Sequence, residues 1–428
     1  MNIRDKLNRL DKSEASAEPN IEAVEGNPLW IQDFQRELDT KILQEQNSFI
    51  ILKENYYPLY DLKALENLHS HEFRFSNFHH IAPEVESGEL NLRKTIFIDL
   101  ETTGLSGGTG TFAFLVGLGH IELDHIVVRQ YLLPDFQYEW LMLKLVENNF
   151  IDFDHLITFN GKSFDVPLLQ TRFAMNRMES SLDQLQHIDL LHASRRIWKR
   201  RLSSCDLQNL EFAILGQSRI NDIPGEMIPQ LYFEYIRKRN AGILRNVLEH
   251  NYRDIVNLAL LAIHIGGVVN DPLAVLNDEL DILSFSRYLF ARKNYSEAKP
   301  LLQFLIDNSL NHETQIESMY YYSMLLKKSG ETEESGKVFH DLLKLQRHHP
   351  EAIIELAKYY EHTEQNYTAA LELIQHSLDG MALYEQLERE HPLLKIRDDL
   401  LYRRERLLSK NARLENQSDI SQKNISEK

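Results

Sequence analysis

The chain has 428 residues, of which 43% are hydrophobic and 26% are charged, and its 47 Lys and Arg against 64 Asp and Glu give a net charge of −17. These values exclude a disordered or fibrous chain and allow two or three globular domains. The acidic balance also argues against a protein that coats nucleic acid or anionic membrane through its overall charge, although it leaves room for a local basic groove.

The single cysteine, Cys205, can form neither an internal disulfide nor a cysteine-based zinc site, which favours a reducing compartment. The first residues lack the apolar core of a signal peptide, and no uninterrupted apolar run approaches the ~20 residues of a membrane span. We therefore expect a cytoplasmic protein with no membrane partner and an inert, buried thiol at Cys205.

The N-terminal part of the chain carries weak patterns. Residues 1–28 are polar and predict a mobile arm. Residues 29–89 contain β-forming runs at 49–52 and 56–60 and a short helical stretch at 62–68. This mixture predicts an extension packed on the domain that follows.

Residues 90–272 have the pattern of an α/β domain. We expect strands at 95–100, 112–119, 126–132, 155–159 and 186–191, and helices at 138–148, 164–175 and 244–265. Three strands joined by turns, followed by alternating strands and helices, predict a mixed sheet flanked by helices. The first three strands would be antiparallel and the later ones parallel, an order that suits a ribonuclease-H-like core.

Residues 278–410 form an all-α region with an internal repeat. A similar segment recurs at 294–298, 331–335 and 366–370, an interval close to the ~34-residue tetratricopeptide period. Each copy contains a small residue that lets two helices approach closely, namely Ala298, Ser335 or Ala370. The region resembles tetratricopeptide repeats without their Trp-Leu-Gly element, and a plain helical bundle is the alternative. A polar tail at 411–428 follows.

Asp99 and Glu101 form the first part of a candidate metal site. Residues two apart in a strand point to the same face, so both carboxylates emerge together from an otherwise apolar strand. Two neighbouring carboxylates repel each other unless a cation lies between them, and Mg²⁺ prefers such oxygen ligands. The alternative is a strand end whose acids simply reach solvent.

Two more acids extend this site. Asp165 follows a strand and an Asn-Gly turn, and Asp254 lies on a helix whose next turns are strongly apolar. An acid on a core-packing face needs a partner or a metal. Four carboxylates in three segments therefore suit a two-metal phosphoryl-transfer site.

These segments carry a family resemblance. The three motifs of the DEDD exonuclease superfamily resemble three parts of this sequence: Ile98–Gly104, Asn160–Asp165 and Asp254. A closer resemblance is to the bacterial YprB-like family, and it is carried by the stretches at 187–191, 207–211, 222–225, 228–229 and 250–251. In that family a ribonuclease-H-like domain precedes tetratricopeptide repeats. The resemblance implies 3′–5′ hydrolysis of phosphodiesters, with two Mg²⁺ or Mn²⁺ ions held by Asp99, Glu101, Asp165 and Asp254.

His250 departs from the superfamily pattern, which usually has Tyr four residues before the last Asp or His five residues before it. Here the histidine stands four residues before Asp254. Residues i and i+4 share a helix face, so a near-neutral imidazole at this position could orient or deprotonate the attacking water. A helix-surface or capping histidine is the alternative.

Two sets of residues are expected to contact nucleic acid. The first would line the terminal nucleotide: Thr102, Thr103, Gly104 and Asn160. The second is a basic run that could neutralise phosphates while its tryptophan stacks on a base: Arg195, Arg196, Trp198, Lys199, Arg200 and Arg201. For the basic run alone, the alternative has equal weight: a solvated, charged helix face with Trp198 packed inward.

The sequence thus predicts a metal-dependent 3′–5′ exonuclease with DNA or RNA as its substrate. A structure-specific endonuclease of the same fold would use similar carboxylates. The other alternative is a non-catalytic scaffold whose repeats bind nucleic acid or a protein partner.

Overall fold

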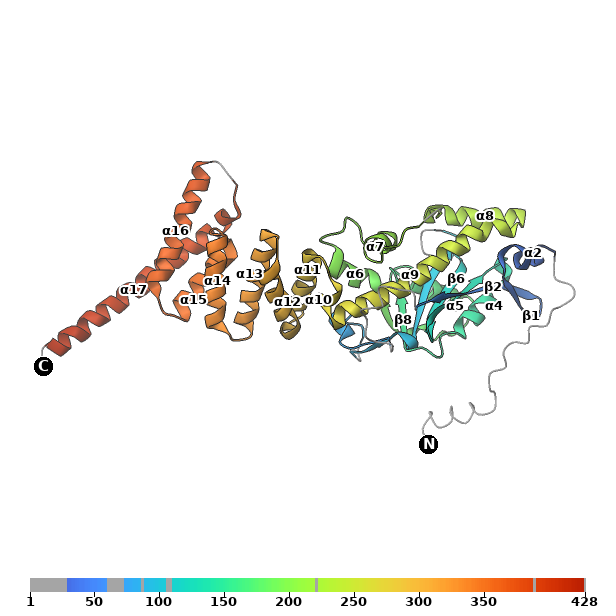
Figure 1. Ribbon diagram of the computed structural model, residues 1–428, viewed down its shortest axis with the longest axis horizontal. Coiled ribbons are helices and arrows are strands. Elements are labelled where there is room, and N and C mark those ends of the chain that lie inside the picture. Colours follow the sequence, from blue (N-terminus) through green and yellow to red (C-terminus); the bar gives the residue numbers. More distant parts are fainter. Residues whose placement is uncertain are drawn as a thin grey trace, which may run out of the picture. The chain divides into compact units, whose positions relative to one another are not determined.

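A computed structural model describes residues 29–59, 73–85, 88–104, 110–219, 222–387 and 390–426. The arm expected at 1–28 and the helix expected at 62–68 lie outside these residues. The chain divides into two compact units, one of residues 1–195 and 204–270 and one of residues 196–203 and 271–428 (Figure 1). No pattern in the sequence predicts that the short segment 196–203 belongs to the second unit.

The first unit is built on a seven-stranded sheet with the order β1-β2-β7-β6-β5-β8-β9. The strands are β1 (Lys41–Glu45), β2 (Ser48–Pro58), β5 (Thr95–Thr102), β6 (Ala113–Glu122), β7 (His125–Leu132), β8 (His155–Thr158) and β9 (Gln186–Asp189). Strands β1, β2, β7, β6 and β5 pair antiparallel, and β5, β8 and β9 pair parallel. The predicted mixed sheet is confirmed. The expected extension does more than pack on this sheet, because it supplies strands β1 and β2.

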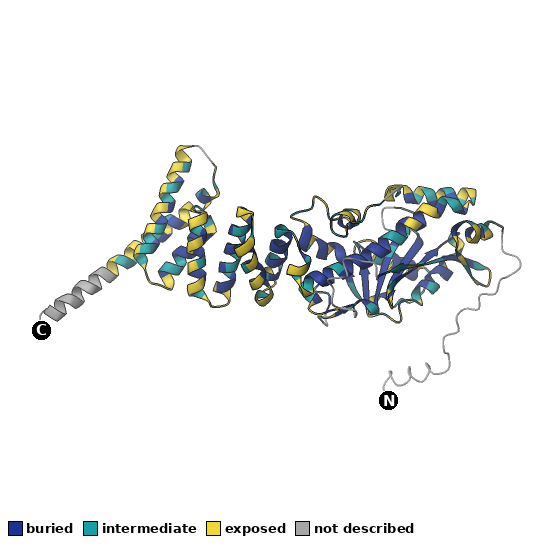
Figure 2. Cartoon of the chain, viewed as in Figure 1, coloured by how far each residue is buried: buried dark blue, intermediate teal, exposed yellow. Residues whose placement is uncertain are grey.

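Helices cover both faces of this sheet (Figure 2). The helices between residues 29 and 270 are α2 (Leu29–Leu38), α4 (Glu139–Glu147), α5 (Asp165–Met175), α6 (Leu190–Trp198), α7 (Leu207–Ala213), α8 (Ile228–Lys238) and α9 (Arg245–Asn270). Of these, α2, α4, α5, α8 and α9 contact strands of the sheet. A small two-stranded sheet, β3 (Arg74–Phe75) with β4 (Leu90–Asn91), lies apart from the main one.

Alternation along β5 decides which side chains reach the site. Ile96, Ile98 and Leu100 point into the core that α4 and α5 help to form. Asp99 and Glu101 therefore point to the opposite face, because side chains alternate along a strand. Helix α9 packs on that face against β5, β6 and β7.

Two glycines of β6 let α9 lie close to the sheet. A Cβ atom at Gly117 would overlap the Asn251 side chain, and one at Gly119 would overlap Ile255. The helical stretch Ala241–Asn270 is long and apolar enough to cross a membrane by length and composition, yet 72% of its apolar window is buried inside the structure. Its place against the sheet accounts for its apolar composition.

The second unit is a succession of antiparallel helix pairs. Its helices are α10 (Pro272–Val275), α11 (Glu279–Ala291), α12 (Tyr295–Asn308), α13 (His312–Lys328), α14 (Thr332–Leu345), α15 (Pro350–His362), α16 (Tyr367–Gln386) and α17 (Arg397–Ser426). The expected small residues Ala298, Ser335 and Ala370 are buried. The all-helical region is confirmed, whereas its membership of the tetratricopeptide class stays a prediction. The expected polar tail has a helical backbone as far as Ser426.

Candidate metal centre

Three ligand atoms converge where β5 ends beneath α9. One atom each of Glu101, His250 and Asp254 lies within 4.8 Å of the others. His250 and Asp254 are one helical turn apart on α9, and His250 Nε2 lies 3.2 Å from Asp254 Oδ2. The i, i+4 spacing therefore brings the histidine to the acid, as the sequence predicts.

Asp99 lies beside this cluster and is held by an amide network. Asn251 Nδ2 donates to Asp99 Oδ2 at 2.7 Å and to the Asp99 carbonyl oxygen at 3.2 Å. Gln130 Nε2, on β7, donates to Asn251 Oδ1 at 2.9 Å and to the Leu248 carbonyl at 2.8 Å. Asn251 is completely buried. This network fixes the orientation of one carboxylate oxygen of Asp99 and leaves the other for a ligand.

Asp165 approaches from the start of α5, after the turn that follows β8. The buried Asp189, at the end of β9, accepts hydrogen bonds from the backbone amides of Asn160 at 2.8 Å and Lys162 at 3.1 Å. Asn160 has a positive φ of 63°, a conformation that asparagine tolerates better than most residues. Asp189 thus holds the turn that places Asp165.

Burial and neighbouring negative charges raise the pKa values of three of these carboxyl groups. Burial raises the pKa of Asp99 well above its ordinary value, and the charges of Asp254, Glu101 and Asp165 raise it further. Burial raises the pKa of Glu101 to about 8, with Asp254 and Asp165 adding to the effect. Burial and the Asp189 charge raise the pKa of Asp165 to about 7. Four acids on three elements therefore share one electrostatic environment.

This donor set fits hard divalent cations. Carboxylate oxygens are the ligands that Mg²⁺ and Mn²⁺ prefer. A bound cation would also offset the repulsion that helps to raise the pKa values of Asp99, Glu101 and Asp165. Glu101 and Asp254 supply two oxygens of one possible site, and Asp99 and Asp165 supply oxygens beside it.

His250 is held between two acids. Its Nδ1 lies 2.9 Å from Asp222 Oδ1, and its Nε2 faces Asp254. Burial lowers the pKa of His250, but hydrogen bonds and charges from Asp254, Glu101 and Asp222 outweigh it and raise the pKa to about 9. The near-neutral imidazole expected from the sequence is therefore a cation here, because three acids surround it.

Arg219 completes the polar network. It makes a bidentate ion pair with Glu211 of α7, lies 2.8 Å from Asp222 and contacts Asp254. Glu211 is 1% exposed, so its charge needs such a partner. Arg219 therefore neutralises part of the acid cluster and restrains Asp222 and Asp254.

Comparison with known proteins identifies the family. Residues 96–265 match the RNase H superfamily. The chain is also 30% identical over 405 residues to an uncharacterized protein, YprB, of Bacillus subtilis (strain 168), in an alignment that covers 91% of this chain and 96% of the relative. The chain belongs to the YprB family. Its RNase H superfamily domain contains all four acids and His250.

Several partners of these acids were not predicted from this YprB-family sequence: Asn251, Gln130, Asp189, Arg219, Glu211 and Asp222. Most act through a contact between segments that lie far apart in the chain, such as the 152 residues between Asp99 and Asn251, whereas Glu211 pairs with Arg219 only eight residues away. Some signal was present, because Asp189, Glu211, Asp222 and Asn251 lie in the stretches that resemble the family.

The predicted basic run has partners inside the second unit. Trp198 is 1% exposed, so the inward-packed alternative describes it. Arg200 pairs with Glu317, Arg201 pairs with Asp281, and Arg196 lies over the Tyr288 ring. Arg195 and Lys199 are exposed. The phosphate-binding role of this run stays a prediction.

The residues expected to line the nucleotide lie close to the acids in the chain. Thr102 Oγ1 donates to the Gly104 carbonyl at 2.8 Å, and Thr103 Oγ1 accepts from the Phe112 amide at 2.9 Å. These bonds order the end of β5 immediately after Glu101. Their contact with a nucleotide stays a prediction.

Proposed function

We propose that this YprB-family chain is a metal-dependent 3′–5′ exonuclease. The observation that carries the proposal is the convergence of Glu101, His250 and Asp254 within 4.8 Å. Asp99 and Asp165 belong to the same group, because Asp254, Glu101 and Asp165 raise the pKa of Asp99, and Asp165 also raises the pKa of Glu101. An RNase H superfamily domain supports nuclease chemistry on such a cluster.

The four acids would hold two Mg²⁺ or Mn²⁺ ions. Bound in pairs, such ions stabilise the attacking and leaving oxygens of an in-line displacement at phosphorus. Asp222 holds His250 at Nδ1, which turns Nε2 towards the acids, where the imidazolium would donate a hydrogen bond to the attacking water and orient it. Thr102, Thr103, Gly104 and Asn160 would contact the terminal nucleotide.

The 3′–5′ direction rests on the resemblance to DEDD exonucleases, and end-labelled substrates test it. With Mn²⁺, we expect a 5′-labelled strand to shorten progressively, a 3′-labelled strand to release labelled mononucleotide at once, and a covalently closed circle to survive. Cleavage of the circle would assign an endonuclease instead. Binding without hydrolysis of any substrate would favour the scaffold alternative.

A further inference from the structure

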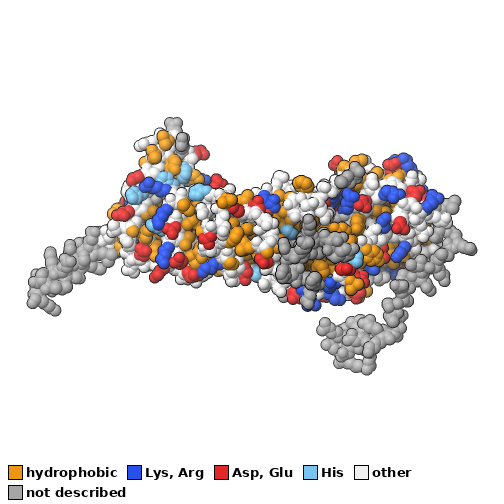
Figure 3. All heavy atoms as spheres, viewed as in Figure 1, with side chains coloured by type: hydrophobic (Ala, Val, Ile, Leu, Met, Phe, Trp, Pro, Cys, Tyr) orange, Lys and Arg blue, Asp and Glu red, His pale blue; other side chains and the backbone are white. Residues whose placement is uncertain are grey.

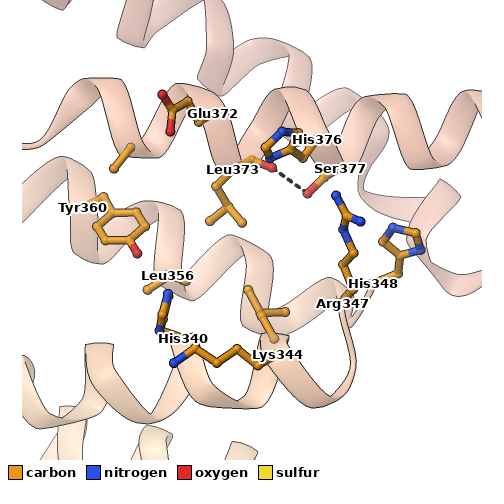
Figure 4. A pocket seen from close by; sticks show the side chains of 12 residues that line it. His340, Lys344, Arg347, His348, Leu356, Tyr360, Glu372, Leu373, His376 and Ser377 are labelled. Atoms are coloured by element: carbon orange, nitrogen blue, oxygen red, sulfur yellow. Dashed lines mark hydrogen bonds between the residues drawn. The ribbon is translucent and has the colours of Figure 1, made fainter.

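The second unit contains a groove rich in nitrogen-bearing side chains. Helices α14, α15 and α16 and the loop between α14 and α15 line a cavity of about 310 Å³. Its walls contain Lys344, Arg347 and three histidines, His340, His348 and His376, against one acid, Glu372 (Figure 4). We call this feature the basic groove.

The cations of the basic groove are available to a ligand. Among the described residues, Arg347 forms no ion pair or hydrogen bond, and it is exposed. Lys344 pairs with Asp341 but has a side chain that is 63% exposed. Figure 3 shows Lys, Arg and His side chains gathered on the face of α14 and α16. Local positive charge in a chain of net charge −17 favours an anionic ligand.

The floor of the basic groove is apolar and aromatic. Leu343, Leu356, Leu373 and Tyr360 line it beside the cations. Proteins that bind single-stranded nucleic acid combine cations for the phosphates with apolar or aromatic surfaces on which bases stack. A purely ionic contact with an acidic peptide would not need this floor.

One end of the basic groove is rigid. His348 Nδ1 lies 3.0 Å from the Tyr384 hydroxyl oxygen, and the Tyr384 ring stacks on His391 with centroids 4.1 Å apart. Burial and the neighbouring Arg347 and His391 lower the pKa of His348, so it is uncharged at neutral pH. A Cβ at Gly380 would lie 2.7 Å from His348 Nε2. His348 is thus fixed beside Arg347 as a hydrogen-bonding group, and the positive charge comes from Lys344 and Arg347.

We propose that the basic groove binds single-stranded nucleic acid, with phosphates on Lys344 and Arg347 and bases against Tyr360 and the leucines. Only one part of this inference rests on the proposed function, namely that the bound strand is the substrate of the nuclease. The helical unit then has a role of its own in substrate binding.

Anisotropy of a fluorescein-labelled oligothymidylate or oligouridylate, titrated with the full chain in EDTA, tests this without hydrolysis. We expect the double variant Lys344→Glu/Arg347→Glu to bind about 10-fold more weakly. The slope of log Kd against log salt should fall by about 0.7 per lost phosphate contact. Both side chains are exposed, so the variant should keep the circular dichroism and Tm of the parent.

A matched control makes the same charge change elsewhere on the helices. Lys328→Glu/Lys337→Glu alters two exposed lysines that do not line the basic groove, and we expect it to keep the parental slope. The inference would be overturned if the two double variants weakened oligonucleotide binding equally, or if neither weakened it. It would also be overturned if polyglutamate displaced the labelled oligonucleotide and unlabelled oligonucleotide did not. Because EDTA suppresses metal-dependent hydrolysis, this binding measurement does not depend on whether the chain is an exonuclease.

Discussion

Asn251 is the residue on which the geometry of Asp99 most depends. It donates to Asp99 and accepts from Gln130, so it joins α9 to β5 and β7 without being charged. A neutral amide can hold a carboxylate in place without neutralising it, which leaves the negative charge for a cation. Arg219 has the opposite effect, because its positive guanidinium pairs with Asp254 and compensates the negative charge of that carboxylate.

Asp99→Asn should separate stability from function. Burial and three neighbouring acids disfavour the charged form of Asp99, so neutralising it removes repulsion. We expect Tm in EDTA to rise, by about 2–4 °C for each kcal/mol of repulsion removed, while Mn²⁺ loses much of its stabilising effect. Differential scanning calorimetry with and without Mn²⁺ checks this. A lower Tm in EDTA would show that the acids are not under mutual repulsion.

Asp222→Asn tests the orientation of His250. The amide keeps the size of the side chain but removes the charge beside Nδ1, so the pKa of His250 should fall. We expect kcat to drop by about 10–100-fold, as for other residues that orient a functional group, with little change in KM. The pH–rate profile should shift to lower pH. An unchanged profile would mean that His250 does not act in turnover.

At the scale of single residues, the sequence predicts the acids and not their partners. Asp99 and Glu101 share a face by strand alternation, and His250 reaches Asp254 by helical spacing, so local periodicity is sufficient for both pairs. The contacts of Asn251 with Asp99, of Asp222 with His250 and of Arg219 with Asp254 depend on tertiary packing, which no local pattern encodes.

The close contact between α9 and the sheet is the feature of the elements that positions the site. Gly117 is paired with Asp99 across β5 and β6 and makes room for Asn251. A methyl group there would push the Asn251 amide away from both of its partners. The same pair of strands holds a β-bulge between Glu101 and Thr102, where the acids end.

Gly117→Ala should therefore impair the site without touching a carboxylate. We expect a loss of about 1–3 kcal/mol in the free energy of unfolding and a reduced affinity for Mn²⁺. Chemical denaturation and isothermal titration calorimetry measure the two effects. The control is Gly225→Ala, where a Cβ meets no atom within 4 Å. Equal behaviour of the two variants would contradict the role given to Gly117.

The errors of sequence interpretation at this scale have physical causes. The apolar pair Leu190-Leu191 predicts the continuation of a strand, but Asp189 Oδ1 accepts a hydrogen bond from the Leu191 amide at 3.1 Å at the start of helix α6. The sequence contains two β-forming runs, at 49–52 and 56–60, and the single strand β2 contains the first run and the start of the second and pairs with β7. A local hydrogen bond decided the first case, and a pairing partner far along the chain decided the second.

At the scale of the whole molecule, the net charge of −17 first argues against nucleic acid, yet it includes acids that a cation would neutralise. Their protonation links stability to pH. Glu101 has a pKa of about 8 against an ordinary 4.5, and His250 has a pKa of about 9 against 6.5. Each group therefore holds a proton in the folded state at a pH where the unfolded chain has released it. The stability they contribute is present below their ordinary pKa values and is lost as the pH rises through the raised ones.

We therefore expect Tm in EDTA to fall by a few degrees between about pH 7 and 9. Half-buried histidines such as His187 and His264, with pKa values of about 4, affect stability only below that window. Because cations compete with these protons, Mn²⁺ should raise Tm more at the upper end. Thermal melts across the window measure both effects, and Glu101→Gln should flatten the dependence. A Tm that rises with pH in EDTA would contradict the assignment.

Metal-dependent hydrolysis by the acid cluster is the central claim, and release of labelled nucleotide from a linear strand measures it most directly. We predict that labelled nucleotide is released with Mn²⁺ or Mg²⁺ and not in EDTA. The Asp99→Asn variant, with its fold verified by calorimetry, should release nucleotide only at the background rate. Release by the folded Asp99→Asn variant at the parental rate, or no release from any DNA or RNA strand by the parent with Mn²⁺, would contradict it.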